Sequence, residues 1–212
     1  MLVMVTTHMA WGFILAFAMW LLKCALGITS YVHLNVTLAV IAGTFGGIFP
    51  DIDRYERIGL EHRKTLHYPI GYLLLAFIAA SAGGLSRSMW LSYASYFFMG
   101  AWIHSLMDIF DGYWRDPEKG VYEHITGRWI KPRGWIPYAS LWEWVLQSLS
   151  NILAVGVSPH LYALFLPGWE IATLCFVIIW AISAIYEARM EAPRRMKIEA
   201  EIRRRMESAM SN

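Results

Sequence analysis

Histidine and aspartate are the residues of this sequence whose types and spacing could do chemistry. His104 and Asp108 are four residues apart, so on a helix they would share one face and could hold one cation together. Imidazole nitrogens and carboxylate oxygens are ligands of zinc, manganese and iron. We therefore predict a site for one or two divalent metal ions, zinc with manganese or iron as alternatives. Its candidate ligands are His8, Asp51, Asp53, His62, His67, His104 and Asp108.

Each of these groups also has an ordinary structural explanation. His8 could cap a helix, the two loop histidines could contact lipid headgroups, and His104 could share a hydrogen bond with Asp108. Asp51 and Asp53 alternate across what we expect to be an extended turn, so only one of them should point inward and the other could orient a ligand. A shared site is favoured because all these groups fall near helix ends, on the same predicted side of a membrane.

The composition indicates which elements must position these residues. Hydrophobic residues make up 57% of the 212-residue chain and charged residues only 16%, against roughly 25% in a soluble domain. This balance predicts an all-α, polytopic membrane helix bundle with membrane lipid as a partner. The net charge of +2 does not indicate a nucleic-acid partner. Six apolar segments are long enough to be transmembrane helices: residues 9–26, 34–49, 67–82, 89–110, 136–157 and 170–186.

The basic residues predict how this bundle is oriented. Six spans place all but two of the 18 Lys and Arg residues on one side, and the exceptions are Lys23 and Arg87. Because basic residues collect on the cytoplasmic side, we expect an inner-membrane protein with both termini in the cytoplasm. Long loops and tails collect charge in any case, which accounts for part of this asymmetry. Residues 1–186 would form the bundle, and residues 187–212 a basic amphipathic helix at its cytoplasmic face.

Three further side chains are candidates for catalytic roles. Asp53 or Glu143 could accept a proton from a metal-activated water. Glu143 begins a polar stripe with Gln147 and Asn151, for which hydrogen bonding between helices is the simpler explanation of the two amides. Arg63 lies between the two loop histidines, and its planar fork suits a phosphate group. Its alternative role is a topology charge.

The sequence resembles the YdjM-like family of membrane-bound, metal-dependent hydrolases over roughly its first 140 residues. The matching elements are Thr7-His8, Pro50-Asp51-Ile52-Asp53, His62-Arg63 with His67, Gly100 with His104 and Asp108, and Trp135-Ile136-Pro137. The family usually has Thr and Ser around the second loop histidine, where this chain has Leu66 and Tyr68. The resemblance implies a metal site and a hydrolase activity.

A more distant likeness concerns the order of the ligands. His8, one of the two aspartates, His67 and then His104 with Asp108 follow an order similar to that of the zinc-dependent phospholipase C and P1 nuclease group. Those enzymes hydrolyse phosphate esters with clustered metals, but they need a later His-x-x-x-Glu pair that this chain lacks. Its only plausible substitutes are Asp111, His124 and Glu143.

Three classes of function follow from these observations. The first is a hydrolase acting on a phosphate ester of a lipid or lipid-linked substrate at the cytoplasmic face. The second is a divalent-metal transporter, and the third is a structural membrane protein with a stabilising metal. A transporter should carry its ligands near the bilayer midplane. The predicted ligands lie at one edge of the spans, which favours the hydrolase.

Overall fold

The computed structural model describes residues 5–54, 59–111 and 120–130, together with isolated positions between 149 and 208. Within this part of the chain the fold is mainly helical, with one small antiparallel hairpin. The long helices are α1 (Val5–Ala25), α3 (Val36–Ile48), α4 (Pro69–Ser86) and α5 (Met89–Asp111). The shorter elements are α2 (Ile28–Val32), the 3-10 helix η1 (Phe49–Arg54), β1 (Val121–Glu123) and β2 (Arg128–Ile130).

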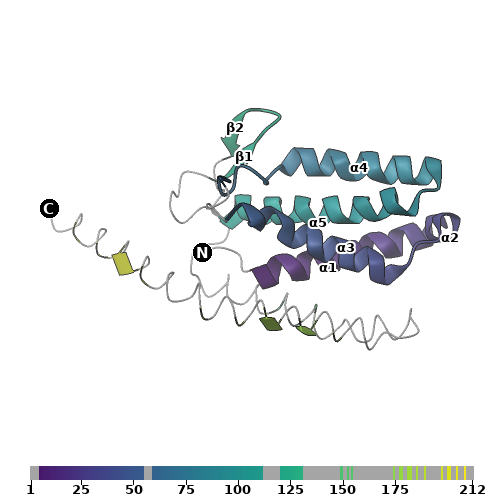
Figure 1. The fold of residues 1–212 in the computed structure, drawn as a ribbon, viewed down its shortest axis with the longest axis horizontal. Helices are drawn as coiled ribbons and strands as arrows, with labels where there is room; N and C mark the ends of the chain where they lie inside the picture. Colours follow the sequence, from purple (N-terminus) through teal and green to yellow (C-terminus); the bar gives the residue numbers. More distant parts are fainter. Residues whose placement is uncertain are drawn as a thin grey trace.

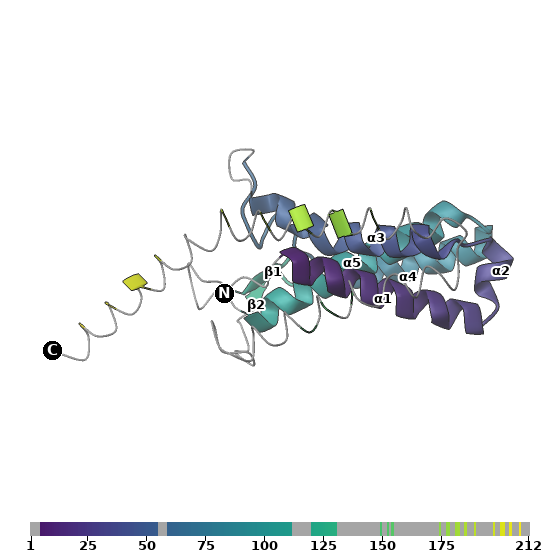
Figure 2. The ribbon, with the colours of Figure 1, turned by 90° about the horizontal axis from the view of Figure 1, so that it is seen from below.

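The four long helices lie side by side, and α5 packs against each of the other three (Figure 1). α1 and α4 begin, and α3 and α5 end, at the end of the bundle where the β1–β2 hairpin lies (Figures 1 and 2). α2 lies at the opposite end. This antiparallel arrangement brings residues from the start of α1, the η1 segment, the loop before α4 and the last turns of α5 to one end of the molecule.

Glycines let α1, α3 and α5 approach closely at that end. A Cβ atom at Gly12 or at Gly100 would collide with the carbonyl oxygen of Gly43, and a Cβ atom at Gly47 would collide with the carbonyl oxygen of His8. The small residues of α3 therefore form a packing surface for α1 and α5. The backbones of α1 and α3 are in contact at His8, which is one of the candidate ligands.

Among the residues that the structure describes, three helical segments are long and apolar enough to cross a membrane: Val5–Ala25, Val36–Asp53 and Pro69–Ser86. They correspond to the first three predicted spans. α5 corresponds to the fourth and has 23 residues, but it is less apolar because polar and site residues interrupt it. A helix enclosed by three others can carry such residues, since protein rather than lipid surrounds them.

The remaining predicted spans, residues 136–157 and 170–186, lie almost wholly outside the described residues, as does the tail, residues 187–212. Six spans are therefore not shown. Apolar side chains nonetheless cover the outside of the described helices. α4 exposes Leu74, Leu75, Phe77 and Ile78, as a helix in contact with lipid would.

Candidate metal centre

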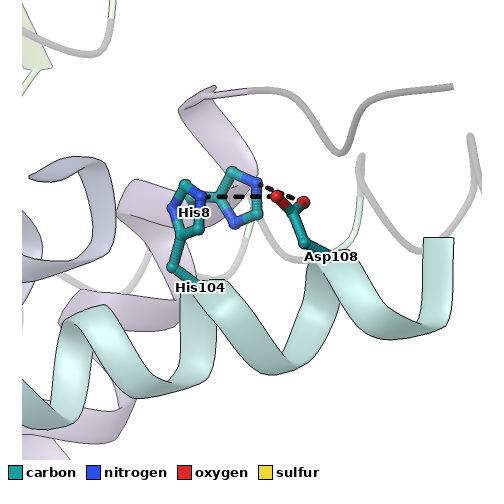
Figure 3. A group of neighbouring side chains, drawn as sticks. All are labelled: His8, His104 and Asp108. Carbon is teal, nitrogen blue, oxygen red and sulfur yellow. Dashed lines mark ion pairs between the residues drawn. The ribbon is translucent and has the colours of Figure 1, made fainter. Parts of the chain in front are cut away.

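Asp108 is the centre of a buried cluster formed by residues from three segments: α1, the loop before α4, and α5. Its Oδ2 lies 3.0 Å from His67 Nε2 and 3.6 Å from His104 Nε2, and its Oδ1 lies 3.5 Å from His8 Nε2. All four side chains are at most 1% exposed. Figure 3 shows His104 and Asp108 rising from one face of α5, with His8 of α1 beside them. The predicted i, i+4 pair is therefore confirmed as one face of one helix.

Two overlapping groups of side chains could hold a metal ion. The first comprises His8, His104 and Asp108, and the second comprises Asp51, His67 and His104. Within each group, the ligand atoms all lie within 4.8 Å of one another. His8 and His104 are stacked with their ring centroids 3.6 Å apart.

The hydrogen bond of His104 Nδ1 shows that Nε2 is the ring nitrogen available to bind a metal ion. Nδ1 donates a hydrogen bond of 2.6 Å to the carbonyl oxygen of Gly47, so Nδ1 carries the proton. The buried Nε2 makes no hydrogen bond to any described residue and faces the carboxylates of Asp51, at 3.8 Å, and Asp108. A lone pair held in this way among carboxylates is the usual condition of a histidine metal ligand.

Asp53 holds two histidines rather than joining either group. Its Oδ1 accepts a hydrogen bond of 2.7 Å from His62 Nδ1, and its Oδ2 accepts bonds from His67 Nδ1, at 2.9 Å, and the Leu66 backbone, at 3.2 Å. Carboxylates that orient a histidine from behind commonly support metal ligands. His62 is thus placed beside Asp53 and outside the two groups, so of the two loop histidines only His67 faces the other ligands.

The turn that carries Asp51 and Asp53 corrects a prediction. It is the 3-10 helix η1, which continues α3 past Pro50, and not an extended turn. Asp51 is 5% exposed and Asp53 is fully buried, so both side chains point inward, where we expected only one. The tighter winding of a 3-10 helix turns Asp51 toward His104 and Asp53 toward the loop before α4.

We expected His67 to open the third apolar helix, but it lies two residues before α4 begins. Burial acts to lower the pKa of His67, but its hydrogen bonds to Asp108 and Asp53 outweigh this effect and raise the pKa to about 9. At neutral pH the ring is therefore protonated and bridges two carboxylates. Burial lowers the pKa of His62, against the opposing effect of the hydrogen bond that His62 donates to Asp53.

The location of Arg63 differs from its interpretation as a topology charge. The residue has a left-handed backbone (φ 60°) and a fully buried side chain. Its Nη1 donates a hydrogen bond of 2.9 Å to the carbonyl oxygen of Asp108, and its Nη2 lies 3.2 Å from Asp108 Oδ1. A guanidinium buried in this position is not a surface charge. It fixes the Asp108 carboxylate instead.

The hairpin is a part of the site that the sequence did not reveal. The Tyr122 backbone donates a hydrogen bond of 2.9 Å to the carbonyl oxygen of Arg63, and His124 donates to that of Lys64. Gly127, at φ 65°, lies in the short turn between the two strands, and a glycine in such a loop was the sequence signal for a hairpin. Nothing in the local sequence indicates that the hairpin binds a loop some 60 residues earlier.

One of the remaining candidates can also be located. His124, a substitute ligand suggested by the likeness to phosphoesterases, is exposed and bonded to Lys64. Glu143 lies outside the described residues. Comparison of the chain with known protein families, with curated proteins and with solved structures found no significant match. The described part of the chain is helical, with three helices that could span a membrane and a buried His/Asp cluster that could hold a metal ion.

Proposed function

We propose that the protein is a membrane-embedded hydrolase that uses a divalent metal ion held by His8, Asp51, His67, His104 and Asp108. The observation that carries this proposal is the orientation of His104. Its Nδ1 proton is committed to Gly47, and its buried Nε2 is left among two carboxylates. Burying such a nitrogen without a partner is unfavourable unless a ligand satisfies it.

The centre would hold one ion, although the sequence left one or two open. Both candidate groups depend on His104, and its Nε2 has a single lone pair. The two groups therefore describe one set of ligands around a single ion. The ligands are three imidazoles and two carboxylates without cysteine, which suits zinc, manganese or iron. The metal would take the place of the proton that His67 Nε2 now shares with Asp108.

The chemistry would be hydrolysis of a phosphate ester of a lipid or a lipid-linked substrate at the cytoplasmic face. A divalent ion in this centre supplies Lewis acidity, which activates water for attack on an ester. Three features support the assignment: the ligands gather at one end of the helices, apolar side chains surround those helices, and the motifs resemble the YdjM-like hydrolases. Asp53 is bonded to two histidines and is therefore better placed to orient them than to take up a proton, which leaves Glu143 as the candidate base.

A structural metal site is the second candidate, because every proposed ligand is at most 5% exposed. A metal transporter fits less well, since its ligands would lie near the middle of the helices. The enzyme and the structural site predict different effects of metal removal. Chelation should abolish turnover in an enzyme, whereas it should only lower stability in a structural protein.

The test combines metal analysis with an activity screen. Purified protein in detergent should contain close to one equivalent of zinc, manganese or iron, and His104→Ala and Asp108→Ala should lose it. His33→Ala is the matched control, since His33 is exposed and lies next to α2. Phosphodiester and phospholipid substrates are then screened with and without chelator. Metal content in Asp108→Ala equal to that of the parent would refute the metal centre.

A further inference from the structure

The β1–β2 hairpin contacts the backbone on both sides of the candidate ligand His67. Before it, the carbonyl oxygens of Arg63 and Lys64 accept hydrogen bonds from Tyr122 and His124. After it, the backbone N–H of Ile70 donates a hydrogen bond of 2.9 Å to the hairpin. The segment that carries His67 is therefore held from outside the helix bundle at two points.

Glu123 makes the contact that follows His67. Its side chain is 1% exposed, and its Oε2 accepts the bond from Ile70 in the first turn of α4. Its Oε1 accepts a bond of 3.0 Å from the Ile125 backbone. Each carboxylate oxygen thus accepts a backbone N–H, and the negative charge lies at the positive end of the α4 dipole.

This arrangement supplies a cap that α4 does not provide for itself. The residue before the helix, Tyr68, makes no side-chain capping bond, and Pro69 at the start has no N–H to offer. A buried carboxylate is costly unless it is hydrogen-bonded. The two N–H groups offset that cost, so the hairpin and the start of α4 stabilise one another.

We propose that Glu123 is a positioning residue of the metal centre. By joining the hairpin to the start of α4, it sets the position of His67 between Asp53 and Asp108. The proposal rests on the proposed metal site, because His67 is a ligand only there. Glu123 itself contacts no candidate ligand in the cluster. It acts through the backbone, three residues from His67.

Glu123→Gln tests this role with little change in size. An amide has one acceptor oxygen and one NH₂ group, so it can accept from only one of Ile70 and Ile125 and places N–H against N–H at the other. Arg128→Gln is the matched control, because Arg128 lies opposite Glu123 in the register of the hairpin but its side chain is exposed. Two readouts apply: cobalt(II) binding followed by its visible absorption, and hydrogen–deuterium exchange of residues 59–72.

We expect Glu123→Gln to bind cobalt(II) about tenfold more weakly than the parent, with an altered visible spectrum, as for other residues that support metal ligands indirectly. Backbone exchange in residues 59–72 should rise, while exchange in α1 and α5 stays unchanged. Arg128→Gln should match the parent in both respects. Parental affinity, spectrum and exchange in Glu123→Gln would overturn the inference. If the parent itself bound no cobalt(II), the metal site would fail, and with it the role of Glu123 in that site.

Discussion

The candidate metal centre has two halves that are held in different ways. His8, His104 and Asp108 belong to long helices, α1 and α5, whose backbones are in contact through glycines of α3. Asp51 belongs to the 3-10 helix η1 and His67 to the loop before α4, and hydrogen bonds hold the ring of His67. The first, helix-borne half is fixed by the packing of the bundle. In the second, loop-borne half, the segment that carries His67 is held by polar contacts to Asp53, Asp108 and a hairpin that follows α5.

This difference shows how one site can be both rigid and adjustable. Helices in backbone contact cannot shift without separating, so the helix-borne ligands have little freedom. The loop-borne half depends on bonds to Asp53, Arg63 and Glu123, each of which a single substitution can remove. Asp108 is the point where the halves meet, since it contacts His8 and His104 on one side and His67 and Arg63 on the other.

The largest effect is expected where the halves meet. Asp108→Ala removes the carboxylate that the buried Arg63 guanidinium and three imidazoles share, so it should lower the free energy of unfolding by about 3–5 kcal/mol. Chemical unfolding in detergent measures this change. Ser105→Ala on the same helix is the control, because its hydroxyl bonds only the Ala101 carbonyl of its own helix. Equal losses for the two variants would mean that Asp108 does not join the halves.

A smaller effect is expected from the helix-borne half alone. Gly100→Ala places a methyl group against the carbonyl oxygen of Gly43 and 2.8 Å from the Gly47 nitrogen, so it should cost about 1–3 kcal/mol of unfolding free energy. Gly84→Ala is the control, since its Cβ would meet nothing within 4 Å, and it should be neutral or stabilising by up to about 1 kcal/mol. Thermal unfolding in detergent distinguishes them. A neutral Gly100→Ala would show that these helices have room to separate.

The sequence predicted the helix-borne half better than the loop-borne half. A four-residue spacing puts His104 and Asp108 on one face, and a run of glycines predicts close packing, because both signals depend on local helical geometry alone. The first four apolar segments correspond to helices for the same reason. The limits of these helices differ from the predicted ones by a few residues, as at His67.

The loop-borne half depended on contacts between distant residues. Arg63 bonds Asp108, 45 positions later, and Glu123 bonds Ile70, 53 positions earlier. No periodicity or local motif encodes such pairs, so Arg63 was interpreted as a phosphate ligand or a surface charge and Glu123 was not singled out. Asp51 and Asp53 were misjudged because we took Pro50 to end the helix, whereas Pro50 lies in the first turn of the 3-10 helix η1, a position that the fixed φ of proline allows.

The loop-borne half should also respond to pH. The pKa of His67 is raised to about 9 in the folded protein, against about 6.5 when unfolded, so folding favours its protonated form. That stability is fully present below about pH 6.5 and is lost as the pH rises toward 9. Between pH 7 and 8, with chelator present, the free energy of unfolding should fall by up to about 1.4 kcal/mol.

His67→Gln isolates this effect. Because burial lowers the pKa of His62 in the folded protein, His62 does not stabilise a protonated folded state and should contribute little to a loss of stability in this range. The variant should therefore show a flat profile between pH 7 and 8. A parent profile as flat as that of the variant would contradict the proposed bridge between Asp53 and Asp108. For the same reason, zinc binding to the parent should tighten as the pH rises, since the metal displaces a proton.

The smallest effect is expected within the turn that precedes His67. The Thr65 hydroxyl accepts a hydrogen bond of 2.7 Å from the Glu61 backbone, and the Glu61 carbonyl accepts bonds from the backbones of Lys64 and Thr65. Thr65→Ala removes one local bond and leaves the hairpin contacts in place, so it should cost about 1 kcal/mol or less, as for the loss of a helix cap. Thr65→Ser keeps the hydroxyl and is the control.

Chemical unfolding and cobalt(II) titration of both variants should show a small loss of stability and parental metal affinity in Thr65→Ala. If the metal affinity of Thr65→Ala instead fell as far as that of Glu123→Gln, the local turn would contribute as much as the hairpin to the position of His67. The hairpin could then not be what distinguishes the loop-borne half from the helix-borne half.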